Sequence, residues 1–341
     1  MQRKSNIELL RIVAMLLVVW VHTNYFSLGD VEWGDVVASP FNSFLKAFAE
    51  QLCIICVDVF VLISGWFGIR PSVKGAMSLL FQVFFFHILV VACLSIAGEP
   101  ASSREISRGF NIGYSYWFIV SYLILYALAP VLNVFIKNAT PRLFLSVLIA
   151  FFVLEFTFGW IGPRIYYRQG YSTISFIGLY LLAQYIRNYS TKLLSFSVCK
   201  NFLLYLLFTL LPVSIYFIVG KDWNMLAYSS PFVISASVFF FLAFNKMNIS
   251  SKVINYLACS ALSIYLVHQN PLLIKPFISL MKHAYMSLGG YLYVLFVIIF
   301  AICFGLLCIM VDKVRIYVWN IICRLFLDKL TPRFEKLMEK L

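Results

Sequence analysis

Apolar runs of about 20 residues, separated by short polar segments, recur along the whole chain of 341 residues. A helix of that length crosses the ~30 Å hydrocarbon core of a bilayer. Only 12% of the residues are charged, whereas a soluble domain carries about 25%, so polar side chains cannot cover a water-facing surface. The sequence therefore predicts an all-α polytopic membrane protein. It excludes a soluble enzyme, a disulfide-stapled secreted domain and a disordered chain.

About ten helices are predicted to cross the membrane. Pro and Gly residues mark the connections between them. The predicted spans are residues 6–27, 44–68, 76–97, 115–136, 142–161, 173–188, 200–219, 229–246, 254–273 and 289–312. We therefore expect residues 1–312 to form one membrane domain.

Lysine and arginine residues are divided unequally between the two sets of predicted connections. With the N-terminus in the cytoplasm, eighteen basic residues fall in cytoplasmic segments and eight in external segments. Basic residues accumulate on the cytoplasmic side of membrane proteins, so both termini are predicted to be cytoplasmic. The net charge of +13 is scattered between apolar runs and forms no basic domain. Nucleic acid is therefore not an expected partner, whereas the lipid bilayer is.

Residues 313–341 have a different pattern. Apolar side chains such as Val314 and Val318 recur at helical spacing among basic ones such as Lys313 and Arg315. This pattern favours a basic amphipathic helix on the cytoplasmic lipid surface. A loosely ordered charged tail is the alternative.

Three ionisable residues, Glu8, Arg11 and His22, lie in the first predicted helix, where a charge is costly in a bilayer. At about 100° and ~1.5 Å per residue, Arg11 and His22 share one helix face and are separated by about 16 Å along the axis. Glu8 can pair with Arg11, three residues later. The alternative is that Arg11 extends to the cytoplasmic interface and that His22 only hydrogen-bonds a neighbour. We favour a polar face directed into the bundle.

Two carboxylates are predicted within later spans. Asp58 lies in the second predicted helix on the same face as Gly65, which permits a close helix approach. A buried carboxylate needs a partner, and we expect His22 or Arg11 to supply it. Glu155, in the fifth predicted helix, has no partner that the sequence identifies.

The ninth predicted helix carries a second polar pair. Tyr265 and His268 are three residues apart, and His268 is expected near the depth of His22. His87 and His283 lack such neighbours and are expected to be structural or solvated.

The eight cysteines predict neither a disulfide framework nor a metal site. Most lie in apolar stretches, where cysteine behaves as a small hydrophobic residue. Cys53 and Cys56 have CxxC spacing but lack the soluble βαβ context of a redox motif.

Four segments, spread from residue 6 to residue 268, resemble the signatures of one family. They are Asn6–Ile12 with the Arg11-x10-His22 spacing, Val57–Gly65 ending in Ser-Gly, Tyr116–Ile119 followed by Tyr122 and Pro130, and Ser263–His268. In this order they resemble the acyltransferase 3 family of bacterial membrane proteins.

The resemblance implies a ten-helix bundle in the bacterial cytoplasmic (inner) membrane. Such a bundle transfers an acyl group, commonly acetyl from acetyl-CoA, to a hydroxyl of a cell-surface carbohydrate such as an exopolysaccharide, or of its lipid-linked precursor. Acyl-CoA is then a co-substrate, and no permanently bound cofactor or metal is expected. In the family the arginine and histidine of the first helix are tied to activity, and here they are Arg11 and His22. Members that acetylate O-antigen carry Arg-x-x-Arg after Ser-Gly, where this chain has Arg70 and Lys74.

This chemistry assigns roles to the polar residues. His22 is the expected base, because imidazole titrates near the working pH, and Asp58, His268 or Glu155 would hold its tautomer. Arg11, Arg70 and Lys74 would bind the phosphates of the donor. Substrate contacts are expected at Trp117, Tyr265, His268, Glu155 and Ser64. Plain packing is the alternative for the two aromatic residues.

Two other functions compete with acyl transfer. One is export of a polysaccharide or a lipid-linked intermediate, which broken helices with a site at mid-membrane would favour. The sequence shows no inverted repeat and few Gly or Pro residues inside the spans. The other is a membrane module that serves a partner enzyme.

Overall fold

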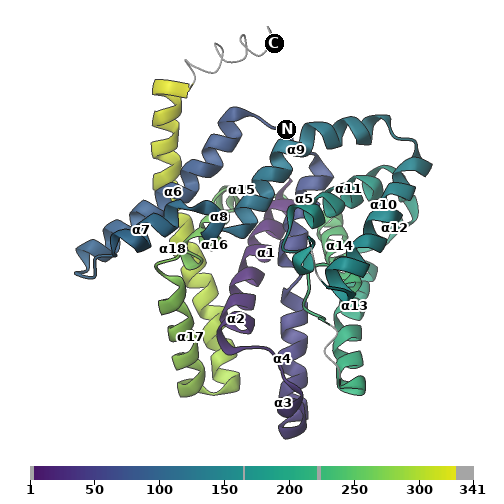
Figure 1. The fold of residues 1–341 in the computed structure, drawn as a ribbon, viewed down its shortest axis with the longest axis horizontal. Coiled ribbons are helices and arrows are strands. Elements are labelled where there is room, and N and C mark those ends of the chain that lie inside the picture. Colours follow the sequence, from purple (N-terminus) through teal and green to yellow (C-terminus); the bar gives the residue numbers. More distant parts are fainter. Residues whose placement is uncertain (1–3, 164–165, 221–223, 328–341) are drawn as a thin grey trace.

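The computed structural model describes residues 4–163, 166–220 and 224–327. Every regular element in this part of the chain is a helix (Figure 1). Seven helical segments there are long and apolar enough to cross a bilayer: Ser5–Leu28, Pro40–Phe67, Val73–Ile96, Trp117–Asn138, Pro141–Ile161, Val198–Val219 and Gly290–Phe326. The all-helical, multi-pass architecture is thereby confirmed, and the count of ten spans and the side of the termini stay predictions.

The helices follow one another through short connections. The first half contains α1 (Ser5–Thr23), α2 (Tyr25–Leu28), α3 (Trp33–Ala38), α4 (Pro40–Cys53), α5 (Cys56–Phe67), α6 (Val73–Ile96), α7 (Ser103–Phe110), α8 (Ile112–Ser115) and α9 (Trp117–Asn138). The second half contains α10 (Pro141–Glu155), α11 (Thr173–Tyr189), α12 (Thr191–Ser195), α13 (Val198–Val219), α14 (Pro231–Lys246), α15 (Lys252–Ala258), α16 (Leu262–His268), α17 (Ile274–Leu288) and α18 (Gly290–Ile322). A π-helical turn, Phe156–Ile161, extends α10.

Helix α1 lies at the centre of the bundle (Figure 1). It contacts α4, α5, α14, α15, α16 and α18, while α11 packs on α5 and α13 packs on α14. Leu10, Ala14 and Val19 of α1 are completely buried. A helix that is apolar on most of its surface is expected in such an interior position. Its few polar side chains must therefore find partners on the surrounding helices.

Three of the predicted spans are interrupted. The helix predicted over 6–27 is broken at Asn24, between α1 and α2. The prediction of one helix over 44–68 is corrected to α4 and α5, which are separated at Ile54–Ile55. The prediction of one helix over 254–273 is corrected to α15 and α16, with a tight turn at residues 259–261. This turn is tolerated inside the bundle because backbone hydrogen bonds, such as that from Ser260 N–H to the Leu257 carbonyl, satisfy it within protein.

The C-terminal third also differs from the prediction. Helix α17 occupies a segment that was expected to be an external connection, and α18, which is 33 residues long, ends at Ile322 and not at the predicted boundary at residue 312. The start of α1 and the end of α18 lie toward the same end of the molecule (Figure 1). Residues 328–341 of the predicted amphipathic tail lie outside the described residues.

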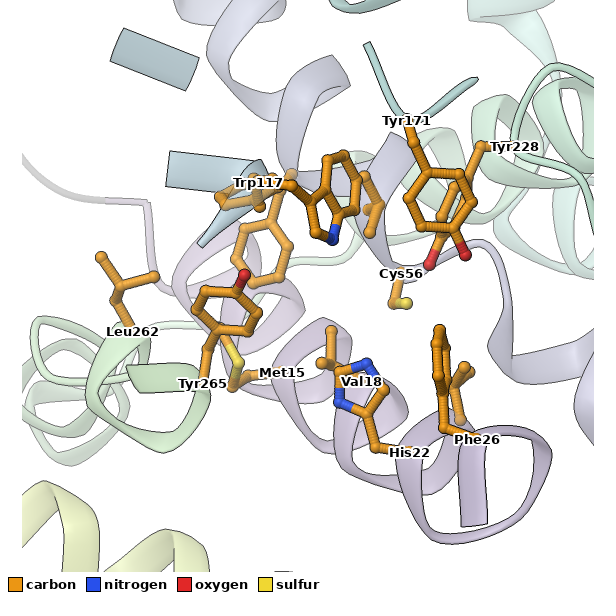
Figure 2. A pocket seen from close by; sticks show the side chains of 14 residues that line it. Met15, Val18, His22, Phe26, Cys56, Trp117, Tyr171, Tyr228, Leu262 and Tyr265 are labelled. Atoms are coloured by element: carbon orange, nitrogen blue, oxygen red, sulfur yellow. The ribbon is translucent and has the colours of Figure 1, made fainter. Parts of the chain in front are cut away.

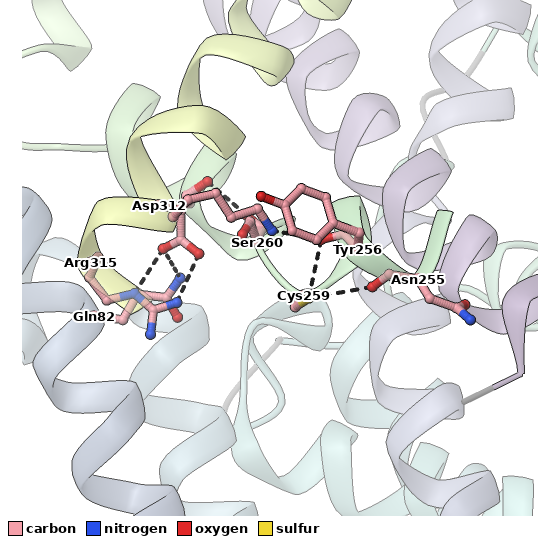
Figure 3. A network of polar contacts seen from close by, with 9 residues as sticks. Gln82, Asn255, Tyr256, Cys259, Ser260, Asp312 and Arg315 are labelled. Atoms are coloured by element: carbon pink, nitrogen blue, oxygen red, sulfur yellow. Dashed lines mark hydrogen bonds and ion pairs between the residues drawn. The ribbon is translucent and has the colours of Figure 1, made fainter. Parts of the chain in front are cut away.

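A buried polar network fastens the end of α18 (Figure 3). The guanidinium of Arg315 donates two hydrogen bonds of 2.8 Å to the Asp312 carboxylate, which also accepts one of 3.1 Å from Gln82 on α6. Lys313 donates to the Tyr256 carbonyl. Arg315 was predicted on the polar face of a lipid-surface helix, and it is instead buried, because a neighbouring carboxylate makes its burial tolerable.

Candidate active site

The predicted polar face of α1 is present, and its two ends have different partners. At the first turn, the Arg11 guanidinium donates to the Glu8 carboxylate, which confirms the predicted pair. The Arg11 side chain is 35% exposed, so its charge remains accessible. About 16 Å further along the axis, His22 lies in the last turn of the helix.

His22 and His268 form a hydrogen-bonded pair of imidazoles. Nδ1 of His22 lies 2.7 Å from Nε2 of His268, and the ring centroids are 4.9 Å apart. The side-chain amide of Gln269 lies 2.9 Å from the same Nδ1 atom. The prediction that His268 lies near the depth of His22 is therefore confirmed. Because α16 ends at His268, two consecutive side chains from one turn can approach α1.

The hydrogen bonds determine where the protons of this pair lie. Nδ1 of His268 lies 2.5 Å from the Ile264 carbonyl oxygen, which can only accept, so this nitrogen carries a proton. In a neutral ring Nε2 of His268 then accepts, and Nδ1 of His22 donates. The amide of Gln269 fits this arrangement with its oxygen turned toward His22. Nε2 of His22 keeps a lone pair and has no hydrogen-bond partner among the described residues.

A pocket adjoins His22 (Figure 2), and its empty space, together with the open solvent at its mouth, amounts to about 520 Å³. Aromatic rings form most of its wall, and its lining contains no Lys, Arg, Asp or Glu among the described residues. The rings of Trp117 and Tyr171 lie 4.6 Å apart, and those of Tyr171 and Tyr228 lie 4.8 Å apart. Tyr265 stands on the other side of His22 from Tyr228 (Figure 2). Trp117 and Tyr265, expected at the substrate site, both line the pocket.

The pocket continues along α1 from His22 toward Arg11. Met15 and Val18, which share the face of Arg11 and His22, line it. Tyr122 hydrogen-bonds Ser64, in the last turn of α5, over 3.3 Å and lies within electrostatic reach of Arg11.

The connection between α5 and α6 is tied to two other helices. Ile69 N–H donates to Tyr180 Oη over 3.0 Å, and the Asn133 amide donates to the Ile69 carbonyl over 2.9 Å. Ser72 N–H donates to Tyr126 Oη over 2.8 Å. These bonds hold the connection against α9 and α11.

This connection carries the two cations that were predicted to bind the donor. The side chains of Arg70 and Lys74 are exposed, in the connection and in the first turn of α6. Gly65, just before them, confirms the predicted close approach, because a Cβ atom there would lie 2.7 Å from the Tyr180 carbonyl oxygen. The partner helix is α11.

The two predicted intramembrane carboxylates are not at the pocket. Asp58 lies beside Glu155 and Ser237, and no hydrogen bond or ion pair among the described residues joins it to His22 or Arg11. The expected partnership with α1 is therefore wrong. Its physical reason is that α5 turns Asp58 toward α10 and α14, whereas Cys56, two residues earlier, faces the pocket. Glu155 and Ser64 do not line the pocket either.

Sequence reasoning missed several pocket residues. Tyr171 and Tyr228 lie in irregular segments that carry no helical periodicity. Cys56 was interpreted as a hydrophobic residue only. Gln269 follows His268 directly, and the prediction of one unbroken helix over 254–273 concealed the end of α16 at His268, from which both residues approach α1.

Comparison with known proteins agrees with these features. A family model described as an acyltransferase domain, that of the acyltransferase 3 family, matches residues 4–310. In the comparisons with curated proteins and with solved structures, no match reached significance. Because the match covers most of the chain, the protein belongs to the acyltransferase 3 family, and it is a multi-pass membrane acyltransferase.

Proposed function

We propose that this member of the acyltransferase 3 family transfers an acetyl or similar short, uncharged acyl group from acyl-CoA to a hydroxyl of a cell-surface carbohydrate or its lipid-linked precursor, in the bacterial cytoplasmic membrane. The observation that carries the proposal is the pair of His22 and His268 at the wall of an aromatic pocket. A hydroxyl becomes a competent nucleophile when a positioned base removes its proton.

His22 would act as that base through its unpartnered Nε2 atom. As the hydroxyl oxygen bonds to the thioester carbonyl carbon, Nε2 takes the hydroxyl proton. The carbon–sulfur bond then breaks, and the proton passes to the leaving thiolate to give the CoA thiol. The bond from Nδ1 of His22 to His268 would orient the ring and stabilise its charged form, as a carboxylate does in hydrolytic triads.

The separation of Arg11 and His22 fits the donor. The pantetheine arm has about thirteen bonds between its sulfur and its phosphate and spans about 15 Å when extended. The axial distance from Arg11 to His22 is about 16 Å, and Met15 and Val18 line the pocket between them. Phosphates near Arg11, Arg70 and Lys74 would thus place the thioester at His22.

The pocket wall favours an uncharged acyl group. A succinyl group would bury its free carboxylate, and the described lining offers no Lys or Arg to pair with it. The rings of Trp117, Tyr171 and Tyr228 combine an apolar face with a polar edge, which suits a sugar ring. These rings are the proposed acceptor site, with Tyr265 beside them.

The experiment compares cells that lack the protein with cells that produce it. Membranes are incubated with acetyl-CoA or succinyl-CoA labelled in the acyl group, and label in the surface polysaccharide is counted. We expect acetyl label in the polysaccharide of cells that produce the protein and none in the deletion. Production of the His22→Gln variant in the deletion should not restore the label. Equal incorporation with and without the protein would contradict the proposal.

Export of a glycan is the second candidate, and the breaks between α4 and α5 and between α15 and α16 favour it. Cys56 begins α5 and Leu262 begins α16, and both line the pocket, as in transporters whose discontinuous helices surround a site at mid-membrane. The same deletion separates the two functions. If the protein is an exporter, its deletion leaves the glycan absent from the surface. If it is an acyltransferase, its deletion leaves the glycan present and unacylated.

A further inference from the structure

A buried asparagine follows the two residues that contact His22. Asn270 lies in the turn after α16 and is completely buried. Its Oδ1 atom accepts a hydrogen bond of 3.1 Å from Leu272 N–H, which determines the orientation of the amide. The Nδ2 atom therefore points the other way, with two hydrogens to donate.

Both hydrogens have an acceptor on another helix or connection. Nδ2 of Asn270 lies 3.4 Å from Nδ1 of His87 on α6. It also bonds Tyr116, directly before α9, whose hydroxyl donates to the Leu266 carbonyl over 3.3 Å. Tyr116 and His87 are both completely buried. The turn that carries His268 is thus held from two sides.

His87 connects this turn to the peripheral helix α7. Because its Nδ1 atom accepts from Asn270, Nε2 carries the proton and donates to the Ile106 carbonyl over 2.9 Å. Gly109 packs so closely on the ring that any Cβ atom would overlap it. The two ring nitrogens therefore serve two contacts, one to α7 and one to the Asn270 turn.

We infer that His87, Tyr116 and Asn270 form a positioning clamp that holds His268 and Gln269 against His22. The inference rests on the proposed role of His22 as the base. A polar group inside a membrane bundle is costly unless its hydrogen bonds are made, and every side-chain polar atom of this clamp has a partner in the described residues. Such a fully connected network fixes one geometry.

The clamp acts on the distance between the two imidazoles. His268 and Gln269 reach His22 from the end of a seven-residue helix, which has little stiffness of its own. Release of Asn270 would let the turn move and lengthen the 2.7 Å contact with His22. A displacement of about 1 Å in a catalytic arrangement costs about 100-fold in rate.

Two substitutions of His87 separate its two contacts. His87→Asn keeps an acceptor near the position of Nδ1, facing Asn270, and His87→Gln keeps a donor near the position of Nε2, facing Ile106. We expect His87→Gln and Asn270→Ala to lower kcat about 10- to 100-fold with an unchanged KM for acetyl-CoA, and His87→Asn to stay within about threefold. An equal kcat in His87→Gln and His87→Asn would overturn the clamp and leave His87 as an anchor of α7 only.

A spectroscopic measurement tests the clamp independently of turnover. The chain has only four histidines, so the imidazole ¹⁵N resonances of the full protein in detergent can be assigned by substitution. We expect the hydrogen-bonded Nδ1–H signal of His22 to persist in His87→Asn and to weaken or shift in His87→Gln. An unchanged signal in His87→Gln and Asn270→Ala overturns the inference. If wild-type protein transfers no acyl group, this signal still tests the clamp, and only the proposed function has failed.

Discussion

The pair of His22 and His268 and the pair of Asp58 and Glu155 are both buried inside the helix bundle, but their surroundings are opposite. Both nitrogens of His268 and Nδ1 of His22 have hydrogen-bond partners, and the remaining nitrogen, Nε2 of His22, adjoins a pocket. The carboxyl pair lines no described pocket, and each member has one buried oxygen without a hydrogen-bond partner in the part of the chain that the structure describes. Burial of an ionisable group in a span therefore does not by itself identify the site of chemistry. What distinguishes the proposed site is that Nε2 of His22 has no hydrogen-bond partner among the described residues and adjoins a pocket.

Substitution of His22 is the most direct test of this difference between the two buried pairs. We expect His22→Ala and His22→Gln to lose about 10²- to 10⁴-fold in acetyl transfer, because both remove the base. Gln keeps the approximate size and hydrogen bonding, so it should restore folded yield but not turnover. The measurement is glycan acetylation per unit of folded protein. Near-normal turnover of the Gln variant would remove His22 from the mechanism and leave His268 as the next candidate.

Substitution of His268 should have a smaller effect. His268 was expected to contact the substrate, but it does not line the pocket, so in the proposed mechanism it only orients the base. We expect His268→Ala to lower kcat about 10- to 100-fold and His268→Gln to lose less, since the amide oxygen can still accept from His22. His283→Ala, at an exposed histidine of α17, is the matched control. A His268→Ala variant with the kcat of this control would show that the imidazole contact has no role in turnover.

Substitutions in the proposed donor-binding connection should change the KM for acetyl-CoA and leave kcat unchanged. Replacing Arg70 and Lys74 together by Ala is expected to raise the KM for acetyl-CoA about tenfold, because charge-assisted contacts to phosphate are lost while the pocket stays intact. Lys192→Ala, at an exposed lysine of α12, is the control for net charge. Unaltered donor affinity in the double variant would exclude this connection from the donor site.

The smallest effect on turnover is expected when Asp58 or Glu155 is substituted. Asp58→Asn keeps the size of the side chain and removes a carboxyl group that no contact among the described residues joins to His22, so we expect kcat within about threefold of wild type. Turnover is measured on folded protein, with Glu155→Gln in parallel. A loss of 100-fold or more in Asp58→Asn would return this carboxylate to the mechanism and would break the distinction drawn above.

Much of the site could be predicted because it depends on local periodicity. The pair of Glu8 and Arg11 follows from spacing along α1, and the shared face of Arg11, Met15, Val18 and His22 follows from the helical repeat. The depth of His268 was predicted from the position of its span. Gly65 was predicted to permit close helix packing, and it does so against α11.

Contacts between helices could not be derived in the same way. Asp58 and Cys56 are two residues apart in α5, and only the rotation of that helix in the bundle decides which of them faces the pocket. His87 was expected to be structural or solvated. Its buried link to the His268 turn depends on Asn270, which is 183 residues away in sequence.

The sequence alone determined the membrane environment, the all-helical architecture, the family signature and the polar face of α1. These follow from composition and from a repeat of about 3.6 residues, both of which are local properties of the chain. The tertiary structure decided which polar groups meet. It placed His268 and not Asp58 against His22, because α16 packs on α1 and ends at His268, whereas Asp58 faces Glu155. Helix rotation and broken helices are set by packing of the whole bundle, and no single segment encodes them.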